Sequence, residues 1–406
     1  MSYNVVMSLL RVRLIGSLLV LALVLGLTLV PSRPGYGNAN YSLSVRGTQI
    51  IDPYGQEVLL RGVNYLGLDD SPESHTEADY ARFAQMGFNV VRLPIPWARL
   101  EPSPGSIDMS YISRYVSRDV EWARKYGLYV VLNIAQYRWA EKFGGGGAPE
   151  WTVQGYAPTE EGMREAVSNF WVDGYLQYRF FQVWTEIARR FVNEPSVAGY
   201  DILNEPWIYT SVIPYLDATY LDVFYLKVIK AIRTVDSNHI IFLEPANMNT
   251  FRFPLKENIV WSPHFYPLAY ASVYSSNDVG RLDADLEAKY KQFVLGLGCP
   301  MWIGEFGAFM NNEKSRNDWL RDAVKVLDKY QVGWAWWAYS GGKIQPIPTS
   351  LRITSVKETS YTFTTATVQT EDWLGRLMPA ALAVVFVMGL IRIYLKYRKT
   401  IRRESQ

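Results

Sequence analysis

Residues 198–207 read AGYDILNEPW, an apolar run that ends in an Asn-Glu-Pro tripeptide. Such a run is typical of a strand covered on both faces, as in a parallel sheet. Comparable runs recur before and after it. Eight strands are predicted, at residues 58–63, 89–93, 129–134, 198–203, 240–244, 259–263, 301–304 and 333–338. The carboxyl ends of such strands are where this kind of fold places its chemistry.

Amphipathic stretches between these runs are typical of helices. The predicted helices cover residues 78–86, 110–126, 175–191, 221–232, 282–295 and 318–330. Repeated strand–helix units predict an α/β fold, either a (β/α)8 TIM barrel or a doubly wound sheet. No glycine-rich phosphate fingerprint follows the first strand, which disfavours a dinucleotide-binding sheet. Two irregularities stand out: no clear helix separates Glu244 from Ile259, and no amphipathic helix follows the last strand before the stalk. Residues 140–174 form a long insertion after strand three.

The composition is that of a folded domain. Of 406 residues, 49% are hydrophobic and 20% are charged, which excludes a largely disordered chain. A net charge of +2 argues against a nucleic-acid partner. The single cysteine excludes an intramolecular disulfide, and three scattered histidines do not suggest a metal site. The aromatic content of 15% suits sugar-binding clefts, large cores and membrane interfaces alike.

Both ends of the chain contain uncharged hydrophobic segments. Residues 14–30 follow two arginines, so residues 1–34 are predicted to be a signal peptide or a signal-anchor helix. A second such segment predicts a transmembrane helix over residues 373–395, with a basic cytoplasmic tail at 396–406. The alternative for this second segment is a helix buried in a core.

The charges around these segments predict how the chain is arranged across a membrane. Positive residues mark the cytoplasmic side, which places the body of the protein outside the cell and the tail inside. Residues 35–345 are then an extracellular barrel domain at the cell membrane, and residues 346–372 are a Ser/Thr-rich stalk. Only the hydrophobic ends would contact membrane lipid. The sequence does not indicate an oligomeric state.

Two predicted strands end in a glutamate with a distinctive setting. Glu205 belongs to the Asn-Glu-Pro tripeptide, and Glu305 lies in the sequence Trp-Ile-Gly-Glu-Phe-Gly at 302–307. The other strand-end residues are Asn64, Tyr65, Arg92, Gln136, Asn204, Glu244, His264, Tyr266 and Trp337. The tripeptide also occurs at 193–195, before the strand, so Glu194 is expected at the opposite end of the barrel.

These motifs resemble those of the family 5 glycoside hydrolases, the cellulase family of clan A. The resemblance rests on Arg92, on Asn-Glu-Pro after strand four, on His264-x-Tyr266, on Glu305 and on Trp337, each in order at a strand end. It covers roughly Tyr41 to Gly342. It implies a (β/α)8 barrel and cleavage of β-glycosidic bonds in a carbohydrate substrate, with neither cofactor nor metal.

The same resemblance assigns roles. Glu205 is expected to be the acid/base and Glu305 the nucleophile of a retaining hydrolase, and an anionic Glu305 should help Glu205 to keep its proton. Arg92 and Tyr266 are expected to hold Glu305. Asn204 is expected to bind the sugar 2-hydroxyl, His264 to line the same subsite, and Trp337 to form its floor. The alternatives are a barrel salt bridge for Arg92, a structural hydrogen bond for His264 and a core position for Trp337.

The chain departs from the family after strand three. The family usually has a histidine there, whereas this chain has Ala135, and Gln136 is a candidate substrate-binding replacement. Four tryptophans are further candidates for sugar platforms: Trp97, Trp139, Trp151 and Trp207. The substrate is left open between a β-glucan, a β-mannan or related saccharide, and a glycolipid. A transglycosylase would use the same residues, and a catalytically silent membrane-anchored receptor would be expected to lack one glutamate.

Overall fold

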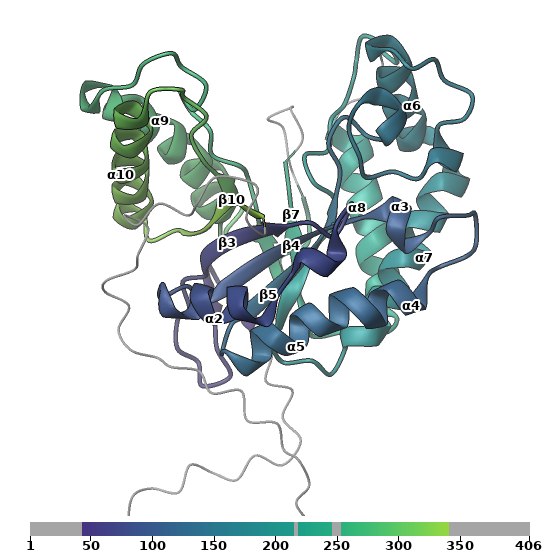
Figure 1. Cartoon of the computed structure of the whole chain (residues 1–406), viewed down its shortest axis with the longest axis horizontal. Coiled ribbons are helices and arrows are strands. Elements are labelled where there is room, and N and C mark those ends of the chain that lie inside the picture. The colour runs from purple at the N-terminus through teal and green to yellow at the C-terminus, as the bar shows by residue number, and fades with distance from the viewer. Residues whose placement is uncertain (1–42, 215–217, 246–252, 341–406) are drawn as a thin grey trace, which may run out of the picture.

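The computed structural model describes residues 43–214, 218–245 and 253–340 (Figure 1). Eight parallel strands form one sheet in the order β8-β7-β6-β5-β4-β3-β10-β9. The end strands β8 and β9 meet through parallel bridges between Trp261 and Met301 and between Phe265 and Phe306, which closes the sheet. The predicted (β/α)8 TIM barrel is therefore confirmed.

All eight predicted strands are present. They are β3 (Arg61–Leu66), β4 (Val90–Pro96), β5 (Tyr129–Ala135), β6 (Val197–Asp201), β7 (Ile240–Leu243), β8 (Ile259–Trp261), β9 (Trp302–Phe306) and β10 (Gly333–Ser340). The first was predicted too early, at 58–63. Val58 and Leu60 precede β3 and are buried in the base of the barrel, so their apolar character reflects packing below the strand.

A short hairpin that the sequence analysis missed closes the amino-terminal end of the barrel. It consists of β1 (Ser44–Arg46) and β2 (Gln49–Ile51), paired antiparallel. Its Ile50 packs in one cluster with Val90 and Tyr129, which are the first residues of β4 and β5. The backbone N–H of Val45 donates to Asn258 Oδ1 at 2.9 Å, just before β8. The mouth at the carboxyl ends of the strands is thus left as the place for a ligand.

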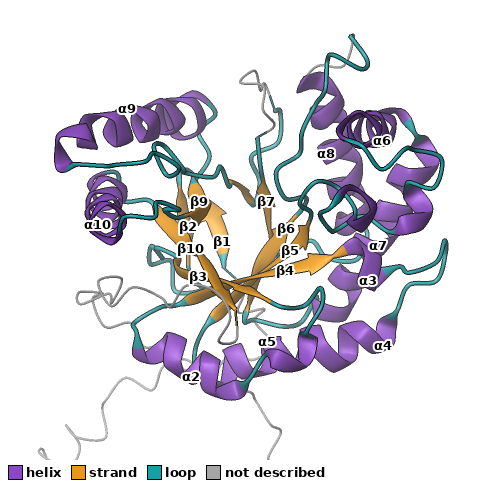
Figure 2. Ribbon diagram, turned by 45° about the horizontal axis from the view of Figure 1, so that its top comes forward, coloured by secondary structure: helices purple, strands orange, loops and turns teal. Residues whose placement is uncertain are grey.

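Helices surround the strands (Figure 2). The helices are α2 (Glu77–Gln85), α3 (Trp97–Leu100), α4 (Met109–Tyr111), α5 (Ser117–Lys125), α6 (Glu160–Val172), α7 (Gly174–Phe191), α8 (Ala218–Arg233), α9 (Val279–Tyr290) and α10 (Glu313–Lys329). A π-helical turn, Ile112–Val116, joins α4 to α5, and another, Lys291–Gly296, extends α9. Short 3-10 turns lie at Pro72–Ser74, Glu141–Phe143, Glu150–Thr152 and Ser276–Asp278. The six predicted helices are confirmed, with small shifts of their ends.

The long insertion after strand three is confirmed, and it contains α6, which the sequence analysis did not predict. Phe170 of this helix contacts the aromatic rings of Trp139, Phe180 and Phe224. The helix begins after Thr159, whose side chain accepts a hydrogen bond from the backbone N–H of Gly162. The insertion is therefore packed onto α7 and α8, beside the mouth of the barrel (Figure 1).

The predicted hydrophobic end segments lie outside the described residues, as do the Ser/Thr-rich stalk and the basic tail. Within the described part of the chain, no helix combines the length and the hydrophobicity needed to cross a bilayer. The stretch between Glu244 and Ile259 contains no helix at residue 245 or at residues 253–258, in agreement with the irregularity seen in the sequence.

Candidate active site

Arg92 on β4 organises the mouth of the barrel from within. Its side chain is completely buried. It donates hydrogen bonds of 2.8–2.9 Å to Asp201 Oδ2, Asn64 Oδ1, Glu305 Oε1, Asn204 Oδ1 and Glu244 Oε1. Burial alone would lower the pKa of this guanidinium, but the carboxylates of Asp201, Glu305 and Glu244 outweigh it and raise the pKa. Arg92 is therefore a permanent cation that fixes the strand ends around it.

Glu305 on β9 is held at both carboxylate oxygens. Arg92 donates to Oε1 at 2.8 Å, and the hydroxyl of Tyr266 donates to Oε2 at 2.9 Å. Burial raises the pKa of Glu305, although His264 and Arg92 oppose the shift. Burial and the charge of Glu305 also hold the pKa of Tyr266 well above its usual range, so the phenol keeps its proton. The expected contacts of Glu305 with Arg92 and Tyr266 are both present.

Glu205, just after β6, has an unusual backbone. Its φ is 41°, in the left-handed region that non-glycine residues rarely adopt. Its backbone N–H donates to Glu244 Oε2 at 2.7 Å, and its carbonyl accepts from Gln136 Nε2 at 3.0 Å. Its side chain remains 40% exposed. Two neighbouring side chains thus hold the backbone while the carboxylate faces the open mouth.

His264 lies between the two glutamates. Its Nδ1 is 2.8 Å from Glu205 Oε1 and 3.3 Å from Glu305 Oε2, and its Nε2 is 3.3 Å from Glu244 Oε2. Burial would lower the pKa of His264, but Glu244, Glu305 and the hydrogen bond to Glu205 hold it well above its usual range. The imidazole therefore carries a proton that both catalytic candidates can contact.

The expectation that Glu205 has a raised pKa is wrong. Burial does raise the pKa of this carboxyl, but the hydrogen bond and the charge of His264 outweigh burial and lower it. The like charge of Glu305 is outweighed by the protonated imidazole that lies between the two carboxylates. The spacing along the sequence does not reveal that position of His264.

The spacing of these groups suits two-carboxylate chemistry. One ligand atom each from Glu205, His264 and Glu305 all lie within 4.8 Å of one another. Retaining glycosidases place their two carboxyl groups about 5–5.5 Å apart, whereas inverting enzymes leave about 6.5–9.5 Å for a water. The same three atoms could coordinate a divalent cation only after His264 loses its proton.

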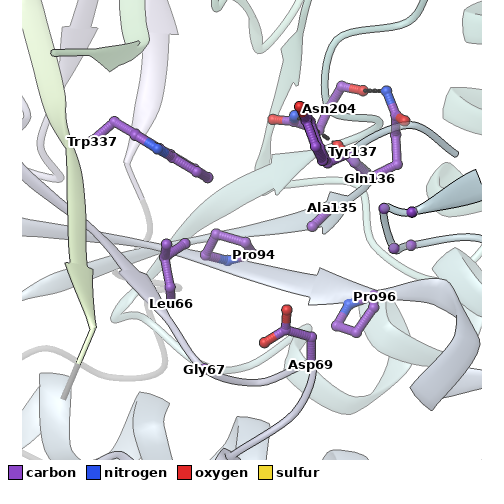
Figure 3. A pocket seen from close by; sticks show the side chains of 14 residues that line it. Leu66, Gly67, Asp69, Pro94, Pro96, Ala135, Gln136, Tyr137, Asn204 and Trp337 are labelled. Atoms are coloured by element: carbon purple, nitrogen blue, oxygen red, sulfur yellow. Dashed lines mark hydrogen bonds between the residues drawn. The ribbon is translucent and has the colours of Figure 1, made fainter. Parts of the chain in front are cut away.

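Two cavities lie at the barrel mouth, one lined by Asn204 and the other by Glu205. The larger, of about 380 Å³, is lined by Leu66, Gly67, Asp69, Pro94, Pro96, Ala135, Gln136, Tyr137, Gly144, Gly145, Gly146, Gly147, Asn204 and Trp337 (Figure 3). The smaller, of about 260 Å³, is lined by Gln136, Tyr137, Arg138, Trp139, Glu160, Met163, Val167, Trp171, Leu203, Glu205, Pro206, Trp207 and Tyr209. Gln136 and Tyr137 line both, so they mark the boundary. We call the first the Asn204 cavity and the second the Glu205 cavity.

Both polar atoms of the Gln136 side-chain amide form hydrogen bonds within the protein. Nε2 donates to the carbonyls of Asn204 at 2.9 Å and Glu205 at 3.0 Å, and Oε1 accepts from the backbone N–H of Trp139. Asn204 Nδ2 in turn donates to the Gln136 carbonyl at 3.1 Å. The predicted contact of Gln136 with the substrate stays a prediction. The observed bonds favour a role in positioning Glu205.

Two carboxylates in this network were assigned no role from the sequence. Glu244 accepts hydrogen bonds from Arg92 and the Glu205 backbone and lies 3.3 Å from His264 Nε2, and Asp201 accepts one from Arg92. In the sequence, both could have been recognised as acidic residues at the end of an apolar strand. Asp201 Oδ1 and Asn133 Oδ1 are both buried without a hydrogen-bond partner, on in-register residues of β6 and β5. Burial raises the pKa of Asp201 to about 7, against the opposing charge of Arg92.

The remaining candidate residues differ in exposure and in whether they line a cavity. Glu194 lies in the turn before β6, as expected, and contacts Arg124 and Ser196. Trp97 and Trp139 are buried, Trp151 is half-buried, and Trp207 is 45% exposed and lines the Glu205 cavity. Trp337 is half-buried and lines the Asn204 cavity, whereas Trp334 and Trp336 belong to the core. Of the four platform candidates, Trp207 has the exposure that sugar stacking needs.

A (β/α)8 barrel whose mouth holds two glutamates at this spacing has the architecture of a glycoside-cleaving enzyme. The chain belongs to glycosyl hydrolase family 5, the cellulase family, whose model matches residues 51–343. It is a glycosidase, and the resemblance seen in the sequence is confirmed.

Similar proteins include both lipid-directed and polysaccharide-directed enzymes. An endoglycoceramidase I from Rhodococcus hoagii is 27% identical over 345 residues, covering 74% of this chain and 68% of that protein. An endoglucanase C from Acetivibrio thermocellus is 25% identical over 316 residues, covering 65% of this chain and 83% of that protein. The crystal structure of an endogalactoceramidase matches with a TM-score of 0.64 and 28% identity, covering 73% of this chain and 74% of that chain.

Proposed function

We propose that this chain is a retaining β-glycosidase in which Glu305 is the nucleophile and Glu205 is the acid/base. The observation that carries the proposal is the 4.8 Å limit on the spacing of their oxygens across His264. In the first step a Glu305 oxygen bonds to the anomeric carbon, and the leaving oxygen takes a proton from Glu205. In the second, Glu205 removes a proton from water, and the water oxygen displaces Glu305.

The environment of each glutamate supports its role. Glu305 is buried, and both its oxygens accept hydrogen bonds from groups that stay protonated, which keeps it oriented, while Arg92 and His264 oppose the rise of its pKa on burial. Glu205 is the more exposed of the two and shares a proton with His264 across a 2.8 Å contact. The proton rests mainly on the imidazole and moves to Glu205 Oε1 as the leaving oxygen withdraws it. His264 would thus supply the acid that the lowered pKa of Glu205 does not.

The residues that line the two cavities indicate which end of the substrate would bind in each. The acid must reach the leaving oxygen, and Glu205 lines the smaller cavity, so the leaving group belongs there. Asn204 and Trp337 line the larger cavity, where the reacting sugar would lie over Trp337 with its 2-hydroxyl near Asn204. One amide hydrogen of Asn204 is already donated to Gln136, which leaves the other for the substrate.

The leaving-group side favours an apolar aglycone. The Glu205 cavity contains Met163, Val167, Trp171, Leu203 and Trp207. These five side chains gain free energy by covering apolar surface, and Arg138, Glu160 and Tyr209 on the same lining can bind hydroxyl groups near the glycosidic bond. We therefore propose a glycolipid substrate, in line with the similarity to an endoglycoceramidase. A β-glucan or β-mannan is the second candidate, because the exposed ring of Trp207 could stack on a sugar.

A location outside the cell is part of the same proposal. The hydrophobic segments at residues 14–30 and 377–391, with basic residues beside them, support anchoring at the cell membrane with the barrel outside and the tail in the cytoplasm. A glycolipid substrate would then lie in or near the membrane that holds the enzyme. Protease accessibility of the barrel and of a tag after Gln406 in intact cells tests this arrangement.

The mechanism is tested on the full chain with aryl β-glycosides. The configuration of the first-formed sugar, read by NMR, should be retained, and a 2-fluoro sugar should label Glu305. An inverted product would contradict the proposal. Substrate class is tested with a glycosylceramide and a β-glucan oligosaccharide of the same glycone, and faster cleavage of the oligosaccharide would favour the second candidate. Transfer to added sugar in place of water would identify a transglycosylase.

A further inference from the structure

Glu244, the residue directly after β7, is a buried carboxylate that lines neither cavity at the mouth. Its side chain is 2% exposed. Tyr225 on α8 donates from its hydroxyl to the backbone carbonyl of Glu244 at 2.7 Å, which fixes the end of the strand. Burying a carboxylate costs free energy unless donors and cations compensate it. The partners of Glu244 therefore indicate its role.

Both oxygens of Glu244 face donors that belong to the catalytic group. Arg92 donates to Oε1 at 2.8 Å, and the backbone N–H of Glu205 donates to Oε2 at 2.7 Å. His264 Nε2 lies 3.3 Å from the same Oε2. A protonated carboxyl would turn its own hydrogen toward one of these donors, so the arrangement fits the anion.

The first contact that matters for the reaction is with the backbone of Glu205. A left-handed backbone, with φ at 41°, is unfavourable for a glutamate and persists where surrounding contacts hold it. The bond from the Glu205 N–H to Glu244 is one such contact, and the bond from Gln136 to the Glu205 carbonyl is the other. Losing the first would let the backbone relax and would turn the Glu205 carboxylate away from His264.

The second contact is with the imidazole of His264. Among the described residues, Nε2 has no well-aligned hydrogen bond, so Glu244 acts on it chiefly as a charge. Burial would lower the pKa of His264, and the charge of Glu244 is the largest influence that raises it. The other carboxylates beside the imidazole are Glu205 and Glu305, on Nδ1. Both change in the proposed reaction, because Glu305 is esterified and Glu205 exchanges a proton, whereas Glu244 keeps its charge throughout.

The remaining titratable groups around His264 have partners of their own. Arg92 on β4 and Asp201 on β6 form an ion pair at 2.8 Å. Tyr266 packs its ring edge-on to the imidazole and donates its hydroxyl to Glu305 at 2.9 Å. Glu244 is therefore the constant negative charge that faces the imidazole.

We propose that Glu244 is a positioning residue for the acid/base: it holds Glu205 in its left-handed conformation and retains on His264 the proton that Glu205 delivers. This inference rests on the proposed function, because it assigns Glu244 to the acid half of that mechanism. In the first step the leaving oxygen takes a proton from Glu205 Oε1, which takes one from His264 Nδ1. In the second step water gives a proton to Glu205, which returns one to His264. Glu244 neither gains nor loses a proton.

Glu244→Gln tests this role through the pH dependence of kcat/KM. Glutamine keeps the size of the side chain but removes its charge and offers one acceptor oxygen in place of two. The proton shared by His264 and Glu205 should then be lost at lower pH. The alkaline limb of the profile, measured on the full chain with a phenyl β-glycoside of cellobiose or lactose, should move down by about 1–3 pH units.

The leaving group separates this role from a general loss of structure. A 2,4-dinitrophenolate leaves without a proton, whereas a phenolate or an alkoxide needs the acid. In Glu244→Gln at pH 7, kcat/KM should fall at least about tenfold more for the phenyl glycoside than for the 2,4-dinitrophenyl glycoside of the same sugar. A purely structural defect would lower both values alike.

Glu101 supplies a matched control. Its side chain is completely buried, and its carboxylate also accepts from an arginine and a backbone N–H, those of Arg179 and Gly105, each at 2.7 Å. It follows α3 and lines neither cavity. Glu101→Gln should lower the midpoint of thermal unfolding, yet leave the pH profile and the leaving-group ratio unchanged.

NMR of histidine reads the same proton without a variant of Glu244. The chain has three histidines, His75, His239 and His264, so isotope-labelled imidazole signals are few, and His264→Asn identifies the relevant one. In the unmodified full chain, His264 should keep both ring protons up to the pH at which kcat/KM falls.

A neutral His264 across the active pH range would overturn the role of Glu244. So would an alkaline limb or a leaving-group ratio that Glu244→Gln leaves unchanged, or a limb that moves only in Asp201→Asn. Failure of the proposed function gives a different result: Glu205→Gln would then show no dependence on the leaving group, or turnover would survive Glu305→Gln.

Discussion

The tripeptide Asn-Glu-Pro occurs at both ends of the barrel, as residues 193–195 before β6 and as residues 204–206 after it. At the base, Glu194 accepts hydrogen bonds from Ser196 and pairs with Arg124 at 3.2 Å. Each charge there has an ordinary partner, and no catalytic geometry results. A glutamate in this motif is therefore not by itself a sign of chemistry.

At the mouth, the same tripeptide lies in a cluster that has more carboxylates than cations. Asp201, Glu205, Glu244 and Glu305 share two cationic partners, Arg92 and His264. Buried charges without full compensation cost stability, and such clusters gather at functional sites. The left-handed backbone of Glu205 adds to this cost. The comparison indicates that the base contributes stability and the mouth contributes reactivity.

The largest effects on activity are expected for the two glutamates at the mouth, and the smallest for Glu194 at the base. Glu305→Gln removes the nucleophile and should lower kcat/KM by about 10⁴-fold or more. Glu205→Gln should lower kcat/KM for substrates with poor leaving groups by about 10²–10⁴-fold, since the general acid is lost. Glu194→Gln changes the same tripeptide at the base and should leave kcat/KM within about twofold. Steady-state kinetics of the three variants decides, and comparable losses in all of them would remove the distinction between the two ends.

A substitution in the hairpin tests whether the base of the barrel contributes to stability but not to activity. Ile50 is 6% exposed in the hairpin under the barrel, so Ile50→Ala should cost about 2–4 kcal/mol of unfolding free energy. Because the hairpin lies at the opposite end from Glu205 and Glu305, kcat/KM of the folded fraction should stay unchanged. Urea unfolding and kinetics on the same preparation measure both quantities. A loss of activity without a loss of stability would show that the base is coupled to the site.

An intermediate effect is expected at Gln136, which holds the backbone of Glu205. Gln136→Leu keeps the approximate size but removes both hydrogen bonds to the carbonyls of Asn204 and Glu205, each worth about 0.5–1.5 kcal/mol. We expect kcat to fall about 10–30-fold while KM changes little, because the acid is misplaced and the sugar is still bound. A rise in KM alone would instead support the direct substrate contact predicted from the sequence.

The sequence was sufficient for features that depend on local pattern. Apolar runs of strand length predicted all eight strands. The resemblance to family 5, carried by motifs at strand ends, implied the contacts of Arg92 and Tyr266 with Glu305 that the structure contains. The hairpin was missed because Ser44–Arg46 and Gln49–Ile51 are too short for a periodic signal. The pKa of Glu205 was misjudged because it depends on where His264 lies, which is a property of the closed barrel. Glu244 was noted but given no role, because its three contacts come from different strands.

The smallest expected effects are opposite pH dependences at the two ends. Asp236, near the base, contacts His239 and Tyr200, and these bonds lower its pKa against the effect of burial. A carboxyl whose pKa is lowered on folding stabilises the protein above its unfolded pKa, near 3.8, and this stability is lost as the pH falls below that value. Asp236→Asn should therefore lessen the acid-side loss of unfolding free energy.

Asp201, at the mouth, should behave in the reverse sense, because burial raises its pKa to about 7. Between pH 3.8 and about 7 the unfolded chain loses this proton while the folded chain keeps it, so unfolding free energy falls as the pH rises. The retained proton would make a donor of a buried carboxyl that otherwise has one oxygen, Oδ1, without a partner. Asp201→Asn imitates the protonated acid and should flatten this fall. Urea unfolding at several pH values measures both slopes, and slopes of the same sign for Asp201 and Asp236 would contradict the contrast between mouth and base.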